Sequence, residues 1–173
     1  MVVIRGETVD DFRAIREINL AAYGTSYETE RIDRLRSDGA IVASLIAVAN
    51  ERIVGHTLFS SLTVRGEAVK SPVASLASVA VLPEEQRRGV GSELVRKGLE
   101  VCRSAGLVAV FVLGDPGYYA RFGFSSELAR KFTSPENVGV GGAFMAIEIR
   151  TGALGNIRGT IEYPARYWPS SIV

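Results

Sequence analysis

The sequence predicts an α/β domain with a mixed sheet, antiparallel in its first half and parallel in its middle. Two β-rich segments, 41–49 and 53–64, flank a short polar turn, which is typical of an antiparallel hairpin. Further on, an apolar segment over 73–82, an amphipathic helix over 91–105 and a second apolar segment over 108–113 follow one another. This strand–helix–strand order favours parallel pairing of the two strands through a right-handed crossover.

The N-terminal part supplies one edge strand and two helices. Val2–Ile4 is a short apolar run that we expect to form the first strand. A helix with an approximate apolar stripe is expected from Thr8 to about Ala22. A second, more polar helix is expected from about Glu28 to Ser37, and Gly39 ends it. These helices precede the hairpin in the chain.

The clearest helix covers 91–105, because apolar side chains form one stripe along it and charged ones lie outside that stripe. The segments before and after it are almost wholly apolar, as expected for strands that are covered on both faces. A short helix over 116–122 and late strands over 144–149 and 159–163 complete the prediction. The result is a mainly antiparallel central sheet with one parallel strand pair and helices on both faces.

Composition and charge narrow the classes of function. With 173 residues, 47% apolar and 23% charged, the chain is expected to form one globular domain over 1–173. Twenty Lys and Arg against nineteen Asp and Glu leave a net charge of +1, so no nucleic-acid partner is expected. One cysteine and one histidine exclude an internal disulfide and make a metal site unexpected. We expect no signal peptide, no membrane contact and a cytoplasmic location.

A glycine-containing turn, Gln86-Arg87-Arg88-Gly89-Val90-Gly91, joins the apolar segment 73–82 to the clearest helix. The first turn of a helix has unpaired N–H groups and the positive end of the helix dipole. The two glycines allow close approach of an anion, and the arginines add positive charge. The turn therefore predicts a phosphate site, although it matches neither a Walker A loop nor a three-glycine dinucleotide motif. The alternative is an ordinary turn with a solvated arginine pair.

This turn resembles the Q/R-x-x-G-x-G/A pyrophosphate loop of the GCN5-related N-acetyltransferase (GNAT) superfamily. Val79-Ala80-Val81, followed by Pro83, resembles the fourth strand of that family and its exit. The segment Tyr119-Ala120-Arg121-Phe122-Gly123-Phe124 resembles the late Y-x-x-x-G-F element. Leu113–Pro116 and the ending Gly159…Tyr163 are similar to the YhbS-like branch of N-acetyltransferases. The specific resemblance covers residues 79–124.

The resemblance implies acetyl-CoA as the cofactor. It also implies a GNAT-like sheet in which the fourth and fifth strands, 73–82 and 108–113, splay apart to hold the pantetheine arm. Val79 and Val81 would bond the pantetheine through their main chain, and the amides of Arg87 to Ser92 would hold the pyrophosphate. The residues implied at the cofactor are Val79, Ala80, Val81, Gln86, Arg87, Arg88, Gly89, Val90, Gly91, Ser92, Asp115 and Tyr118.

The implied activity is acyl-CoA-dependent N-acyl transfer, in which a primary amine attacks the thioester directly in a ternary complex. The oxyanion that forms would meet a backbone N–H near Val79 or Ala80. Tyr119 stands where the family places a general acid for the departing thiolate. Tyr118 competes for this role, and only one of the two can face the sulfur, because successive helical side chains point about 100° apart.

The general base is less clearly marked. Only about 0.04% of a lysine-like amine is neutral at pH 7, so the amine must lose a proton. Many relatives carry a carboxylate on or beside the fourth strand, where this sequence offers only serines. Glu28 is the best remote candidate, with a solvated carboxylate as its alternative. His56, in the middle of a strand, and Cys102, on an apolar helix face, are expected to be structural, and Asp115 either contacts the cofactor or caps the short helix.

A second function stays open at this stage. The missing strand carboxylate favours a non-catalytic acyl-CoA-binding sensor or regulatory module, whereas Tyr119 favours an enzyme. The expected acceptor is a small-molecule or peptide amine. Homodimers are frequent in the family, and the resemblance leaves one open for this chain.

Overall fold

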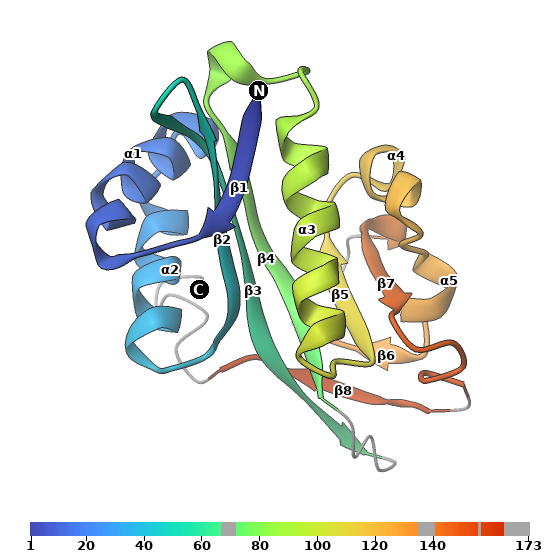
Figure 1. The fold of residues 1–173 in the computed structure, drawn as a ribbon. Helices are drawn as coiled ribbons and strands as arrows, with labels where there is room; N and C mark the ends of the chain where they lie inside the picture. The colour runs from blue at the N-terminus through green and yellow to red at the C-terminus, as the bar shows by residue number, and fades with distance from the viewer. Residues whose placement is uncertain (67–71, 135–140, 156, 165–173) are drawn as a thin grey trace.

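The computed structural model describes residues 1–66, 72–134, 141–155 and 157–164, which form a mixed α/β fold. The sheet has the strand order β1-β2-β3-β4-β5-β7 (Figure 1). Strand β8 pairs with β3, and β6 pairs with β8. The strands are β1 (Val2–Gly6), β2 (Ile41–Ala49), β3 (Arg52–Gly66), β4 (Val73–Val81), β5 (Ala109–Leu113), β6 (Phe132–Thr133), β7 (Phe144–Glu148) and β8 (Gly159–Glu162). The α-helices are α1 (Phe12–Tyr23), α2 (Tyr27–Ser37), α3 (Val90–Ser104), α4 (Pro116–Tyr119) and α5 (Ser126–Ala129).

The predicted order of elements is confirmed, with shifts at the ends. The first helix begins later than Thr8, because a 3₁₀ turn over Val9–Asp11 precedes α1. The Asp11 carboxylate accepts the Thr8 N–H at 2.7 Å and two hydrogen bonds from Arg5, at 2.7 and 2.9 Å. The sequence analysis did not predict α5 and β6, which have four and two residues and are too short to show a hydrophobic period.

Strand β4 has a different neighbour along each of its two edges. It pairs with β3 in antiparallel fashion over most of its length. With β5 it pairs in parallel only over Val73–Ser75, opposite Ala109–Phe111. The register on the β3 side shifts so that Ala77 has no partner, which is the pattern of a β-bulge. From the bulge to its end, β4 therefore leaves its β5-side edge open.

Helices cover both faces of the sheet. Figure 1 shows α3 across the front of the sheet, α1 and α2 on its left, and α4 and α5 beside β5 and β7. Gly55 and His56 on β3 show the two faces, because successive side chains of a strand point to opposite sides. A Cβ atom at Gly55 would meet side chains of α3, whereas His56 contacts Asn19 of α1. Packing is close on the α3 face, where a Cβ atom at Gly98 would lie 2.1 Å from the Phe59 ring.

His56 belongs to a buried polar cluster under α1. Its Nδ1 lies 3.1 Å from the Asn19 amide nitrogen, and its Nε2 lies 3.0 Å from the Ser44 hydroxyl. Ser44 donates to Glu7, which also accepts hydrogen bonds from Arg36. Burial, with a smaller effect from the Arg36 charge, lowers the pKa of His56 to about 3. The imidazole is therefore neutral at pH 7 and serves the fold, as predicted.

This depressed pKa makes a prediction for stability. The unfolded chain binds a proton at His56 below about pH 6.5, whereas the folded chain does so only near pH 3. The free energy of unfolding should therefore fall as the pH drops from 6.5, with a slope from this group of up to about 1.4 kcal/mol per pH unit. Urea unfolding of the wild type and of His56→Gln at pH 5, 6 and 7 measures this. The variant should be less stable at pH 7 but less sensitive to pH; equal slopes would contradict the assignment.

Candidate active site

The open edge of β4 presents main-chain groups from every second residue. The carbonyl of Ala77 accepts a hydrogen bond from Arg31, and that of Val79 accepts one from the Tyr23 hydroxyl at 2.9 Å. The carbonyl of Val81 accepts from the Gln86 side chain at 3.0 Å. Three side chains from outside the sheet thus bond three alternate carbonyls where a neighbouring strand would otherwise pair. The Val79 N–H also points to this edge and donates to the Tyr23 oxygen at 3.2 Å.

Ala80 differs from the sequence-based expectation. The main-chain groups of a strand alternate between its two edges, so a residue next to Val79 faces β3. Ala80 is indeed paired with His56, and the Leu82 N–H, two residues on, donates to β3 at Val54 over 3.0 Å. The N–H of Ala80 is therefore committed to the sheet. Of the two candidates for binding an oxyanion, Val79 alone has its N–H at the open edge.

A groove of about 670 Å³ runs along this edge from the end of α1 to the start of α3. It brings together most of the predicted cofactor residues with several that were not predicted. The lining residues are Ala22, Tyr23, Val79, Val81, Gln86, Arg87, Gly89, Gly91, Ser92, Leu113, Gly114, Asp115, Tyr118, Tyr119 and Arg121.

At one end of the groove lies the loop that leads into α3. Arg87 adopts a left-handed backbone conformation with φ of 61°, and Gly89 follows with φ of 89° as the residue before the helix. Turns of this kind direct successive N–H groups to one side and form anion-binding concavities. The first turn of α3 adds N–H groups that lack partners within the helix. Arg87 and Arg121 line the groove here, so the end is suited to a phosphate group.

Two other predicted residues of the loop do not contribute side chains to the groove. Arg88 forms an ion pair with Glu85 at 2.9 Å and does not line the groove. Val90 is buried in the core beside Leu94, where a Cβ atom at Gly55 would meet both of them. Val90 can therefore act on a ligand only through its backbone N–H group, and the Arg88 side chain would have to leave Glu85 to reach one.

The adjacent tyrosines of α4 occupy different places. A Cβ atom at Gly91 would lie 2.9 Å from the Tyr118 hydroxyl, so Tyr118 reaches over the start of α3. The Tyr119 ring instead packs edge-on against the Phe124 ring, with the ring centres 5.7 Å apart. It also lies close over Gly114, where a Cβ atom would be only 2.4 Å from the ring. Burial raises the pKa of Tyr119, with smaller effects from Tyr23 and Tyr118. Its phenol is therefore a proton donor throughout the neutral range.

A smaller cavity of about 180 Å³ adjoins the groove and shares four of its residues, Tyr23, Val79, Leu113 and Tyr119. Glu28, at the start of α2, lies in this smaller cavity, where 15% of its side chain is exposed. Its carboxylate pairs with Arg31 at 2.6 Å. Burial nevertheless raises the pKa of Glu28, because the effect of burial exceeds the opposing effect of Arg31. The solvated-carboxylate alternative does not describe this environment.

Asp115 takes the expected capping role and lies where contact with the cofactor stays a prediction. Its carboxylate accepts the Gly117 N–H at 2.9 Å and caps α4, and the residue also lines the groove. Cys102 is buried in the core, and burial raises the pKa of its thiol to about 12, so the expected structural role fits.

Sequence reasoning missed Tyr23, Arg31 and Arg121. Arg121 lies inside the Y-x-x-x-G-F element, and its guanidinium stacks over the Tyr118 ring at 4.8 Å. Tyr23 and Arg31 sit on α1 and α2, where an aromatic or basic residue alone carries no signal. Their roles depend on the fold, which sets both helices against the open edge of β4.

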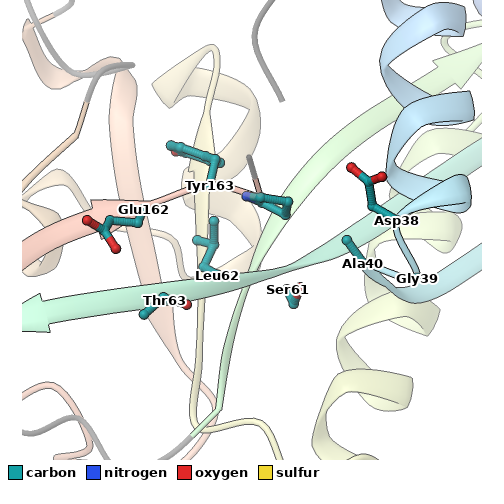
Figure 2. A pocket seen from close by; sticks show the side chains of 9 residues that line it. Asp38, Gly39, Ala40, Ser61, Leu62, Thr63, Glu162 and Tyr163 are labelled. Carbon is teal, nitrogen blue, oxygen red and sulfur yellow. The ribbon is translucent and has the colours of Figure 1, made fainter. Parts of the chain in front are cut away.

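Another cavity, of about 470 Å³, lies where β3 and β8 meet the end of α2 (Figure 2). It shares no lining residue with the groove. Two acidic side chains at its rim are Asp38 and Glu162, and Glu162 is paired with Arg65 at 2.8 Å. Within the described ranges, no group of three or more His, Cys, Asp or Glu side chains could hold a metal ion, and no helix is long and apolar enough to cross a membrane.

Comparison with known proteins agrees with this geometry. Residues 12–124 match the acetyltransferase (GNAT) family. The chain is 30% identical to the uncharacterized N-acetyltransferase YhbS of Escherichia coli K12 over 167 residues, 94% of this chain and 96% of that protein. It is 40% identical to the uncharacterized N-acetyltransferase YjhQ of Escherichia coli K12 over 116 residues, 66% of this chain and 64% of that protein.

Two crystal structures are similar over nearly the whole chain. That of the Escherichia coli GNAT family N-acetyltransferase YhbS in complex with CoA superposes with a TM-score of 0.86 at 29% identity, covering 94% of this chain and 89% of that one. That of a GNAT family acetyltransferase from Brucella melitensis in complex with acetyl-CoA gives 0.77 at 31% identity, covering 95% and 97%. The open edge of β4, the loop before α3 and the agreement with these relatives together place the chain in the acetyltransferase (GNAT) family.

Proposed function

We propose that this chain transfers an acetyl group from acetyl-CoA to a primary amine by direct attack in a ternary complex, with residues 1–173 acting as one domain. The observation that supports this most is the open edge of β4, whose Val79 and Val81 groups face a groove that ends at the start of α3. An extended ligand arm with amide groups can bond such an edge as a further strand would.

The residues of the groove fit the parts of acetyl-CoA. The pantetheine arm is an extended chain with two amides, which suits the Val81 main chain and the Val79 carbonyl, because a carbonyl oxygen can accept a second hydrogen bond beside that of Tyr23. The pyrophosphate is an anion, which suits the N–H groups between Arg87 and Ser92 and the Arg87 and Arg121 guanidinium groups. A bound acetyl-CoA supplies the acetyl group as a thioester at the junction of the groove and the smaller cavity.

At that junction each step has a residue suited to it. The Val79 N–H donates to the thioester oxygen as negative charge develops there. Glu28, whose pKa is raised by burial, accepts a proton from the incoming ammonium group, directly or through a water. The neutral amine then attacks the thioester carbon, the C–S bond breaks, and the second proton of that nitrogen passes to water. Tyr119 donates its phenol proton to the departing thiolate.

The acceptor enters from the smaller cavity in this proposal. Its walls combine the apolar side chains of Leu76 and Leu113 with the Glu28 carboxylate. Arg31 also lines this cavity and pairs with Glu28, so the limited volume, rather than the charge of the walls, favours a small molecule or the end of a peptide. Turnover of a panel of such amines, followed by release of free thiol, tests the proposal. Acetyl-CoA binding without turnover of any amine would favour the sensor alternative.

The phosphate end of the groove gives the first test of the cofactor site. In Gly91→Glu, a carboxylate would stand at the start of α3, beside the pyrophosphate, and the new Cβ atom would press on Tyr118. We expect acetyl-CoA affinity to fall by at least about 100-fold. Titration calorimetry measures this, with Lys97→Gln on the exposed side of α3 as a control for the change of one charge. Unchanged affinity in a folded Gly91→Glu protein would move the phosphate site elsewhere.

The second test concerns the base. Because Glu28 must be ionised to accept a proton, kcat/KM of the wild type should fall as the pH drops through its raised pKa. Glu28→Gln should lower kcat/KM at neutral pH by about 10²-fold or more and remove this acidic limb. Glu30→Gln, an exposed carboxylate on the same helix, is the matched control. An unchanged pH profile in Glu28→Gln would leave Glu28 as a partner of Arg31 only.

The third test separates the two tyrosines. Tyr119→Phe keeps the ring packing against Phe124 and removes the phenol proton donor. The turnover number should fall by about 10²-fold or more, while acetyl-CoA affinity stays within a few fold. Tyr118→Phe should cost much less, because its hydroxyl reaches the start of α3 rather than the junction. If Tyr118→Phe is instead the damaging change, the acid has been assigned to the wrong tyrosine.

A further inference from the structure

The Tyr23 hydroxyl is hydrogen-bonded to the main chain of Val79, which the proposed reaction uses. It accepts the Val79 N–H at 3.2 Å and donates to the Val79 carbonyl at 2.9 Å. It also lies 3.4 Å from the Ser78 hydroxyl, which donates to the buried side chain of Asn19 at 2.8 Å. A phenol oxygen is thus bonded to the N–H that we assign to the thioester oxygen.

An amide N–H has one hydrogen, so the phenol oxygen of Tyr23 and a thioester oxygen compete for it. Val79 and Tyr23 both lie at the junction of the groove and the smaller cavity, where the acetyl group must meet the amine. The competition therefore concerns the acyl end of the ligand rather than its phosphate end.

Tyr23 is placed so that its side chain can move away from Val79. It is the last residue of α1, directly before Gly24, where the helix ends in a left-handed turn. Although its hydroxyl bonds β4, 41% of the residue is exposed. The exposed part of the residue leaves a path for the side chain to rotate toward solvent, where the hydroxyl exchanges its protein partners for water.

We propose that Tyr23 determines how tightly the acyl group binds, because its phenol oxygen occupies the place of the thioester oxygen on the Val79 N–H and must leave when acetyl-CoA binds. Free CoA ends in a thiol, which is a weak acceptor and cannot replace the phenol oxygen there. CoA can therefore bind with Tyr23 in place. This inference rests on the proposed function.

The two ligands make the test specific. In Tyr23→Phe the competing oxygen is gone, so acetyl-CoA should bind more tightly, by about threefold to tenfold for one hydrogen-bonded site. The affinity for free CoA should not change. Titration calorimetry of both ligands with the wild type and the variant gives the four dissociation constants. Tyr163→Phe, which removes a phenol oxygen beside β8 and away from the groove, is the matched control and should change neither affinity.

The outcomes separate this inference from the proposed function. If the wild type binds neither ligand, the proposed function itself fails. If the wild type binds both and Tyr23→Phe binds acetyl-CoA equally or more weakly, Tyr23 does not compete with the acyl group. If Tyr23→Phe tightens both ligands alike, Tyr23 competes with the pantetheine arm, and the assignment to the acyl oxygen is overturned.

Discussion

The parallel pairing of β4 with β5 stops at Ser75, and the candidate site depends on that stop. Had the pairing continued, the main-chain groups of Val79 and Val81 would be used within the sheet. Because the strands diverge, these groups must find other partners, since buried backbone groups in a folded protein are almost always hydrogen-bonded. Side chains from α1, α2 and the loop before α3 supply the partners at three carbonyls.

The same divergence explains where the other residues lie. It opens the groove on one side of Val79 and the smaller cavity on the other, so that a donor and an acceptor can reach one carbon atom from two directions. Tyr119 and Glu28 come from elements that follow β5 and α1; Tyr119 lies at this junction, and Glu28 lines the smaller cavity beside it. The proposed chemistry therefore needs no catalytic side chain on β4 itself, which fits a strand that offers only small and apolar residues there.

The order of elements and the loop at one end of the groove could be predicted from the sequence, because periodicity and a glycine-containing turn are local signals. The side chains that bond the β4 edge could not. Tyr23 and Arg31 act through hydrogen bonds to residues 56 and 46 positions away in the chain, and no local pattern marks such contacts. Ala80 shows the opposite case: its motif position suggested the cofactor, but strand alternation commits its N–H to β3. The burial of Glu28 beside Arg31 could not be predicted either, because it depends on how α2 packs against β4.

The central claim is that the open edge of β4 binds the pantetheine arm, and amide hydrogen exchange measures this residue by residue. Exchange rates followed by NMR with and without saturating CoA should show slower exchange at Val81, by about tenfold or more, when CoA is bound. The Val79 amide, which stays bonded to Tyr23 when free CoA binds, should change little. The amide of Ala80, which is already paired with β3, should exchange slowly in both states. If CoA binds and the exchange rate at Val81 stays the same, the pantetheine arm does not use this edge, which contradicts the proposed binding mode.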